Sequence, residues 1–298
     1  MWLTFLTTNF ILAEVISINF YEKVMKLILV ILIFSFATFS GQIKFKSNFT
    51  VTNSPLQLKN LGESTHNFYY KVTFSNDKDS SIKREALCIL QMGENVSKFF
   101  DFNQLRKDSV IQKYNHKNIL NAREVEEILN IKVDWSTEIV KNSEHMVVQD
   151  KFRDLYQFQE KKPKFIWKLE EGSKEILNYI CNKATVEFAG RTYTAWYSKE
   201  IPFQNGPYKF DGLPGLILEI HDATKAFHFE AIAIDQRPLP IYLRSDKKIF
   251  MVSKEKFRSV QLSYFENPGF FHGQAFSADG QELQKTSKKL PYNLIELE

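Results

Sequence analysis

Histidine is the commonest metal ligand and a frequent general base. Two of the six histidines lie in the run "EIHDATKAFHFEAIAID". Alternation along an extended chain puts His228 and Glu230 on one face, and His221 precedes them across an expected hairpin turn. These three side chains would allow a small metal site. The same three residues would also be expected as solvent-facing polar side chains of an exposed strand, without any metal. We favour that interpretation and predict neither a metal nor a cofactor.

Catalytic motifs give no further candidate. The sequence contains neither the G-x-S-x-G elbow of α/β-hydrolases nor the H-E-x-x-H signature of zinc proteases. An acid pair for glycoside chemistry could be drawn from many of the 35 Asp and Glu residues, so no particular pair is supported. We therefore predict no catalytic residue and lean towards a protein without enzymatic activity.

The two cysteines, Cys88 and Cys181, lie within the apolar runs "ALCIL" and "YICNKATVEF". An even count in an oxidising compartment allows one disulfide, which would close a long loop and stabilise the fold by roughly 4 kcal/mol. Burial of both as free thiols is the alternative, because a free Cys behaves as a small hydrophobic residue. Sequence alone does not choose between them.

The stretch "DGLPGLILEI" combines two glycines with a Leu-Pro pair and then an apolar run. A phosphate loop would need free backbone N–H groups and a following helix, whereas Pro214 removes one N–H and a strand pattern follows. Pro214 at the second position and Gly215 at the third suit a tight β-turn, and Gly212 allows a close backbone approach or a bulge. We predict a rigid structural turn, which comprises Gly206, Pro207, Gly212, Leu213, Pro214, Gly215, Leu216 and Ile217.

The segment upstream of this turn carries the residues that we predict to contact a ligand. Between Arg191 and Ser198, alternation puts Arg191, Tyr193, Ala195 and Tyr197 on one face and Trp196 on the other. An aromatic pair with a guanidinium at its end would hold an apolar or planar molecule. A plain β-core, with Arg191 reaching water or paired with Asp211 or Glu187, is the alternative. The predicted ligand-binding residues are Arg191, Tyr193, Trp196, Tyr197, Tyr208 and Phe210.

The elements that position these residues are mostly strands. Residues 66–91 read as a long hairpin, and from Met146 several short strands alternate with turn clusters. Residues 118–130 and 253–267 show helical spacing, and Ser253 precedes the second helix as an N-cap. We predict a mainly β (α+β) fold: a curved antiparallel sheet, like a half-barrel or bowl, with one to three short helices that partly cover its concave face.

The N-terminus indicates export. From Met25, one Lys is followed by an apolar run that ends in Ser40 and Gly41, the pattern of a secretory signal peptide. We interpret residues 25–41 as that peptide, residues 1–24 as an extension from a misassigned start codon, and residues 42–298 as one β-rich domain. The apolar run is short for a membrane span, and an N-terminal anchor is the alternative. No Cys follows it, so we expect a periplasmic or secreted protein without a lipid anchor.

Composition excludes one class of partner. The net charge is +4, and Lys and Arg are interspersed with Asp and Glu. Nucleic-acid binding requires a dense basic patch, which is not found here. We expect an unknown small ligand or an envelope protein as partner, no nucleic acid, and membrane contact only through the cleaved signal peptide.

One stretch resembles a known family. "GPYKFDGLPGLILEI" is similar to the signature of the GLPGLI family of exported bacterial proteins, and "ICNKATVEFAGRTYTAWYSKEIP" is similar to the segment before it. The resemblance runs over roughly residues 150–235 and extends more weakly to "VSKFFDFNQLRKDS" and the ending "PYNLIELE". It implies an exported β-rich protein and supplies no catalytic residues.

Three function classes follow. We favour a non-enzymatic binding or accessory protein of the cell envelope, with an apolar, peptide or glycan ligand on the concave face of the sheet. The alternatives are a hydrolase that acts on an envelope or external polymer and a partner subunit of an outer-membrane transport complex.

Overall fold

The computed structural model describes residues 48–246, 248–271 and 288–297. The chain divides into two compact units, Met1–Lys44 and Phe45–Glu298, and the description below concerns the second. The predicted signal peptide at 25–41 and the extension at 1–24 lie outside the described residues.

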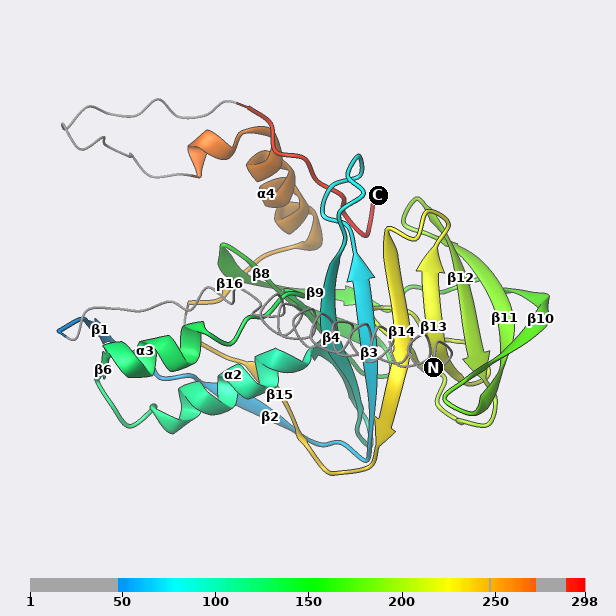
Figure 1. Ribbon diagram of the computed structural model, residues 1–298, viewed down its shortest axis with the longest axis horizontal. Helices are drawn as coiled ribbons and strands as arrows, with labels where there is room; N and C mark the ends of the chain where they lie inside the picture. The colour runs from blue at the N-terminus through cyan, green and yellow to red at the C-terminus, as the bar shows by residue number, and fades with distance from the viewer. Residues whose placement is uncertain (1–47, 247, 272–287, 298) are drawn as a thin grey trace, which may run out of the picture. The chain divides into compact units, whose positions relative to one another are not determined.

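Twelve strands of the described residues form one sheet (Figure 1). Neighbouring strands are antiparallel except the terminal pair of β9 and β16, which is parallel. In spatial order the strands are β10 (Lys168–Ile176), β11 (Tyr179–Phe188), β12 (Arg191–Ser198), β13 (Leu216–Asp222), β14 (Phe227–Asp235), β3 (His66–Phe74), β4 (Arg84–Met92), β5 (Ser97–Asp101), β7 (Thr137–Lys141), β8 (His145–Phe152), β9 (Asp154–Lys161) and β16 (Phe250–Met251).

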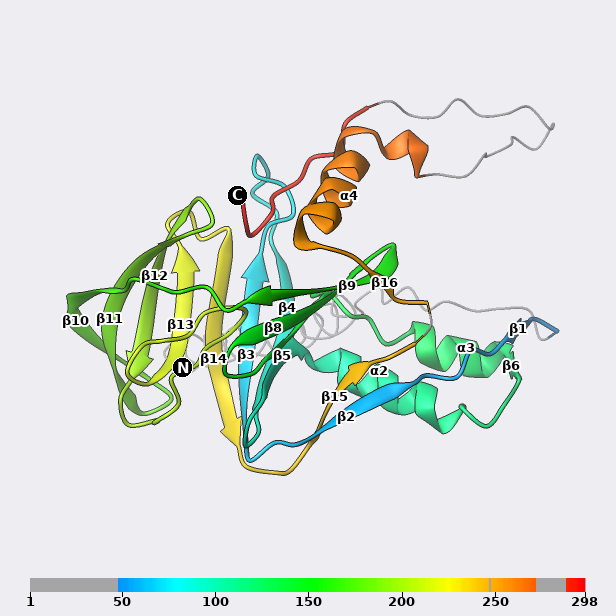
Figure 2. The same ribbon diagram turned by 180° about the vertical axis from the view of Figure 1, so that it is seen from behind.

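The sheet is open and strongly curved. Figures 1 and 2 show that β8 and β9 run across the direction of β3 and β14. The predicted fold class, a mainly β protein with a curved antiparallel sheet and a few helices, is confirmed. The predicted hairpin is also confirmed, because β3 and β4 pair along their whole length from His66 with Met92 to Phe74 with Arg84. The first strands expected from Met146 are β8 and β9, which are separated by a turn in which Arg153 has a φ of 62°.

Two small strand pairs and two helices lie together on one side of the large sheet (Figure 2). The pairs are β2 (Leu58–Glu63) with β15 (Pro240–Arg244) and β1 (Thr50–Thr52) with β6 (Ile119–Asn121), and the helices are α2 (Phe102–Lys113) and α3 (Ala122–Leu129). Polar contacts join them to the sheet. The hydroxyl of Tyr242 donates to Asp108 on α2 over 3.1 Å, and its ring lies 4.3 Å from the ammonium of Lys98 on β5.

The third described helix, α4 (Lys254–Glu266), lies at the other end of the sheet and leads into the short 3₁₀ helix η1 (Pro268–Phe270). The predicted N-cap is confirmed, because the Ser253 hydroxyl accepts a hydrogen bond from the Lys256 N–H over 3.2 Å. The helix predicted over 118–130 is shorter in the structure: α3 begins at Ala122, and Ile119–Asn121 form β6 instead. Sequence patterning missed α2, because its buried side chains, Gln104 and Asp108, are polar. None of the helices among the described residues has the length and apolar character that a membrane crossing requires.

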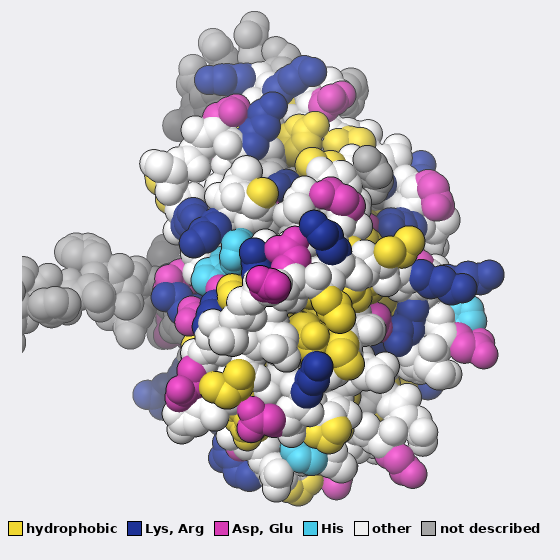
Figure 3. Space-filling model, turned by 90° about the vertical axis from the view of Figure 1, so that its right-hand side faces the viewer, with side chains coloured by type: hydrophobic (Ala, Val, Ile, Leu, Met, Phe, Trp, Pro, Cys, Tyr) yellow, Lys and Arg dark blue, Asp and Glu magenta, His cyan; other side chains and the backbone are white. Residues whose placement is uncertain are grey.

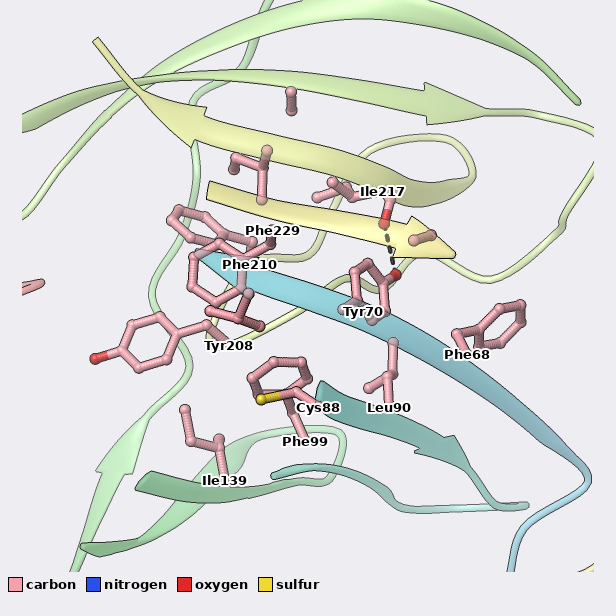
Figure 4. Packing of buried hydrophobic residues seen from close by; sticks show 14 of the residues in the cluster. Phe68, Tyr70, Cys88, Leu90, Phe99, Ile139, Tyr208, Phe210, Ile217 and Phe229 are labelled. Carbon is pink, nitrogen blue, oxygen red and sulfur yellow. Dashed lines mark hydrogen bonds between the residues drawn. The ribbon is translucent and has the colours of Figure 1, made fainter. Parts of the chain in front are cut away.

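The core fills the concave side of the sheet with large aromatic side chains (Figure 4). Tyr70 of β3 is fully buried, and its hydroxyl donates to the Ile217 carbonyl of β13 over 2.7 Å. This bond crosses β14 and ties the N-terminal hairpin to the strand that follows the Gly-Leu-Pro-Gly turn. The hydrogen bond satisfies a polar group that would otherwise be costly to bury.

The allowed disulfide does not form, and both cysteines are free and buried. Cys88 lies on β4 and Cys181 on β11, with β3, β14, β13 and β12 between them in the sheet. Five strand spacings of about 4.8 Å separate their positions along the sheet, whereas a disulfide requires Cα atoms within about 7 Å. Both cysteines therefore pack in the core as small apolar side chains.

The Gly-Leu-Pro-Gly turn is tighter than the predicted β-turn. The Gly215 N–H donates to the Leu213 carbonyl over 2.8 Å, so the bond spans one residue fewer, with Pro214 at its centre. Gly215 has a φ of 148°, and a Cβ added there would lie 2.1 Å from the Ser198 carbonyl oxygen. The close backbone approach therefore falls at Gly215 rather than at Gly212.

A cleft between the concave face and helix α4

A cleft of about 680 Å³ separates part of the concave face from α4 and residues 288–297, which we call the C-terminal segment. Its floor comes from strands and from the loops that join them, and its roof from α4 and the C-terminal segment. The floor includes Phe74, Trp135, Val148, Asp150, Phe158, Tyr208 and Phe227; the roof includes Phe257, Arg258, Gln261, Tyr264, Phe265, Leu290, Leu294, Ile295 and Glu296.

Helix α4 contacts the sheet through aromatic side chains of both its first and its last turns. In the last turn, the rings of Tyr264 and Phe265 lie 5.0 and 5.7 Å from that of Phe152 on β8. Phe257 is buried, and its ring lies 5.4 Å from that of Phe158 and 5.5 Å from that of Tyr156, both on β9. Further along the helix, Gln261 and Phe265 line the cleft and are only partly buried. The helix is thus fixed to the sheet near both ends, and Gln261 between them borders the cleft.

The C-terminal segment is held in place through both its main chain and its side chains. Arg191 of β12 donates to the Asn293 side-chain oxygen over 2.6 Å and to the Leu294 carbonyl over 2.7 Å. At the end of the segment, the Leu297 N–H donates to the Ala189 carbonyl over 2.9 Å. Side chains and backbone from distant parts of the sheet therefore fix this wall of the cleft.

Glu296 is the electrostatic anchor of the segment. Its carboxylate accepts a 2.6 Å hydrogen bond from Tyr208, forms an ion pair with Lys209, and lies 2.9 Å from the ammonium of Lys254. Glu160 of β9 contacts the same two lysines. Burial acts to raise the pKa of Glu296, but the charge and hydrogen bonds of its partners outweigh it and lower the pKa to about 2.

Two carboxylates organise the floor. Asp150 accepts hydrogen bonds from the Ser136 and Thr137 hydroxyls over 2.9 and 2.6 Å, and burial raises its pKa despite these bonds. Asp101, which caps α2 through the Asn103 N–H, also accepts the backbone N–H of Trp135 over 3.0 Å. The Trp135 ring is thereby held in the floor, 5.4 Å from Phe74, and its indole N–H meets no acceptor within the described residues.

The cleft offers little for catalysis. Asp134 forms a 2.6 Å ion pair with Arg84, and Glu296 forms ion pairs with lysines. Both oxygens of Asp150 accept hydrogen bonds from hydroxyl groups. A general base must reach its substrate with an available lone pair. Each of these three carboxylates is therefore bonded within the protein, and aromatic side chains form the walls of the cleft around them.

The structure spreads the six predicted ligand-binding residues over three environments. Tyr193, Tyr197 and Phe210 lie inside the core, each at most 2% exposed, and pack against other rings. Tyr208 lines the cleft. Trp196 lies on the outer face of β12, where the Lys174 ammonium is 4.8 Å from its ring.

Arg191, the sixth, pairs with neither Asp211 nor Glu187, the two partners considered from sequence. Its guanidinium lies 3.1 Å from Asp222 of β13 and 5.0 Å from the centre of the Phe227 ring. Asp211 pairs instead with Lys162 over 2.8 Å, and Glu187 accepts from Thr192. Arg191 therefore supports the cleft by holding the C-terminal segment.

His221 and His228 lie on the outer face of the sheet. His221 and His228 are opposite each other on β13 and β14, with ring centres 5.6 Å apart, but His228 contacts Glu219 over 3.1 Å rather than Glu230. Among the described residues, no group of three or more His, Cys, Asp or Glu side chains is arranged to hold a metal ion. The side of the molecule nearest β10 and β11 carries charges of both signs interspersed with small hydrophobic patches (Figure 3).

Sequence reasoning missed most residues of the cleft. Trp135, Asp150, Arg258 and Glu296 belong to four separate stretches of the chain, and nothing in their spacing links them. One available signal was the helical pattern at 253–267, which placed Phe257 on the inner face of a helix. Another was the resemblance of the ending "PYNLIELE" to a known family, because that ending forms the C-terminal segment.

A buried lysine ties the loop before the Gly-Leu-Pro-Gly turn to the sheet. Lys141 of β7 is 2% exposed, and its ammonium donates to the carbonyls of Gly206 and Phe210 over 3.1 Å each. Burial lowers its pKa from 10.5 to about 7. Between these two values the unfolded chain holds more protons than the folded protein, so the folded state gains stability as pH rises from about 7 towards 10.5.

We expect Lys141→Met to remove this pH-dependent contribution to stability. The wild type should gain up to about 1.4 kcal/mol of unfolding free energy per pH unit above 7 from this group, and the variant should not. Urea denaturation of both proteins at pH 6, 7, 8 and 9 gives the two unfolding free energies, and the wild-type value minus the variant value should increase with pH. Parallel curves for the two proteins would contradict the expectation.

Comparison with known proteins gives a family match over a short part of the chain. Residues 187–219 match a family described as "Protein of unknown function (Porph_ging)". The matched residues include β12 and the Gly-Leu-Pro-Gly turn. No curated protein matches the chain.

Two solved structures of PNGF-II, in space groups P21 and C2, are similar to 66% of this chain, with TM-scores of 0.42 and 0.43 and 13% identity. The matching region spans 32% of the length of those chains.

Proposed function

We propose that this chain is an exported member of the GLPGLI family and acts as a non-enzymatic binding or accessory protein of the cell envelope. Its ligand, of apolar, peptide or glycan type, would occupy the cleft under α4. The family match over residues 187–219, which contains the Gly-Leu-Pro-Gly-Leu-Ile motif, supports the family. The apolar run after Met25 supports export.

The observation that carries the binding role is the cleft itself. Its volume of about 680 Å³ is in the range of small-molecule sites, and aromatic side chains line both its floor and its roof. Ion pairs hold the C-terminal segment over it, so the cleft is part of the fold and not a gap between loose parts. The carboxylates that line it have partners within the protein, which favours binding over hydrolysis.

Native mass spectrometry of the full chain, purified from the membrane-free fraction of a Gram-negative host, tests both parts of the proposal. We expect a mature N-terminus near Gln42 and a bound small molecule. Gln261→Trp fills the cleft from α4 and should abolish the bound mass. Ser263→Trp, on the exposed face of the same helix, should not. A bound mass that persists in Gln261→Trp would place the ligand elsewhere, and an uncleaved N-terminus would contradict export.

A further inference from the structure

The charges that line the cleft differ in how they are paired. Arg84 pairs with Asp134 over 2.6 Å, and Lys209 and Lys254 pair with Glu296 and Glu160. These side chains neutralise one another within the protein. A ligand that bound Lys209 or Lys254 through its own charge would have to break ion pairs with the buried Glu296, which is costly. The Arg84–Asp134 pair is partly exposed, so it contributes less, but its two charges still cancel.

Two charged groups remain. Asp150 lies in the floor, is buried, and has both oxygens occupied by the hydroxyls of Ser136 and Thr137. Arg258 lies on α4, is partly exposed, and donates one N–H to the Glu296 carbonyl oxygen. Within the described residues it has no carboxylate partner. A guanidinium has five N–H donors in a planar fork, so Arg258 retains the donors to bind a carboxylate or phosphate.

The rest of the lining is mostly apolar. Phe74, Trp135, Phe158 and Phe227 form the floor, and the roof adds Phe257, Tyr264, Phe265, Leu290, Leu294 and Ile295. A space between apolar walls is costly to leave empty and holds water poorly, because water finds few hydrogen-bond partners there. A hydrocarbon chain would fill it without leaving polar groups unpaired.

We propose that the ligand is a single-headed anionic amphiphile of the fatty-acid class, with its chain between the aromatic walls and its carboxylate on Arg258. This inference rests on the proposed binding function and deepens it. A free sugar ring would bury several hydroxyls among these aromatic side chains, and the unpaired Trp135 indole N–H could bond only one of them. The geometry therefore favours the amphiphile over a glycan.

The test uses calorimetric titration of the purified full chain, cleared of bound amphiphile on a hydrophobic resin, with laurate, dodecanol, acetate and maltohexaose. Laurate and dodecanol have the same chain length and differ in charge. We expect laurate to bind about ten- to a hundredfold more tightly than dodecanol, because its carboxylate forms charge-assisted hydrogen bonds. Acetate, which lacks the chain, should not bind measurably.

Variants locate the head group. Arg258→Gln should reduce the preference for laurate over dodecanol to near unity, and the dodecanol affinity of the same variant shows that its cleft is intact. Lys256→Gln, on the exposed side of α4, is the matched control and should keep the preference. Equal affinities for laurate and dodecanol in the wild type, or an unchanged preference in Arg258→Gln, would overturn the inference.

The remaining outcomes separate this inference from the proposed function. Binding of maltohexaose but not laurate, with loss of that binding in Gln261→Trp, would overturn the inference of an amphiphilic ligand but would agree with the proposed binding function. If no probe bound and no mass co-purified with the wild type, both the inference and the proposed function would be wrong.

Discussion

Gly215→Val should destabilise the folded protein by on the order of 4 kcal/mol and lower its Tm by about 10 °C. Two costs act at this position. A β-branched residue at a φ of 148° is strained, and its Cβ would lie 2.1 Å from the Ser198 carbonyl oxygen. The atom in the way belongs to the backbone at the end of β12, so relief of the clash would shift that strand away from the turn that leads into β13.

Gly62→Val separates the two costs. Gly62 also has a positive φ, of 117°, but a Cβ added there would have no atom within 4 Å, so only the conformational strain of about 1–3 kcal/mol applies. Urea unfolding of both variants, with the wild type as reference, measures the difference. Equal destabilisation at Gly62 and Gly215 would show that the approach to Ser198 is unimportant, and a Gly215→Val protein with a normal Tm would refute the prediction outright.

Local patterns predicted the elements of this fold well. The alternation in residues 66–91 gave the hairpin of β3 and β4, and the Ser253 cap gave the start of α4. Alternation between Arg191 and Ser198 correctly placed Tyr193 and Tyr197 on one face of β12, and the structure shows that this face is buried. These features depend on interactions between residues that are near one another in the chain, so the spacing of residue types in the sequence predicts them.

The sequence pattern did not predict which distant strands pair with one another. β14 pairs with β3, whose residues lie more than 150 positions earlier, and this contact makes one sheet of the N-terminal hairpin and the later strands. The cleft has the same origin, because Trp135, Asp150, Arg258 and Glu296 meet only after the sheet has curved and α4 has docked. The Gly-Leu-Pro-Gly sequence predicted a tight turn before a buried strand, and the structure has both, but it gave no indication of the cleft.

Glu296→Gln should lower the unfolding free energy by about 3 kcal/mol at pH 7 and release the C-terminal segment from the cleft. The substitution keeps the size of the side chain but removes a charge that two lysines and Tyr208 surround. Lys209 is 3% exposed, so the water that could replace the lost carboxylate has little access to it. Amide exchange should report the release, because the Leu297 N–H, bonded to the Ala189 carbonyl, should exchange faster in the variant than in the wild type.

The pH dependence gives this prediction a signature that a general packing defect lacks. The folded-state pKa of Glu296 is about 2, against 4.5 in the unfolded chain, so its contribution is complete above pH 4.5 and is lost as pH falls towards 2. The difference between wild type and Glu296→Gln should therefore shrink over that interval, because the wild-type carboxylate itself becomes protonated. Glu175→Gln on the exposed edge strand β10 is the matched control and should unfold like the wild type at every pH. A wild-type advantage over Glu296→Gln that stays constant from pH 7 to pH 3 would show that the carboxylate charge does not hold the segment in place.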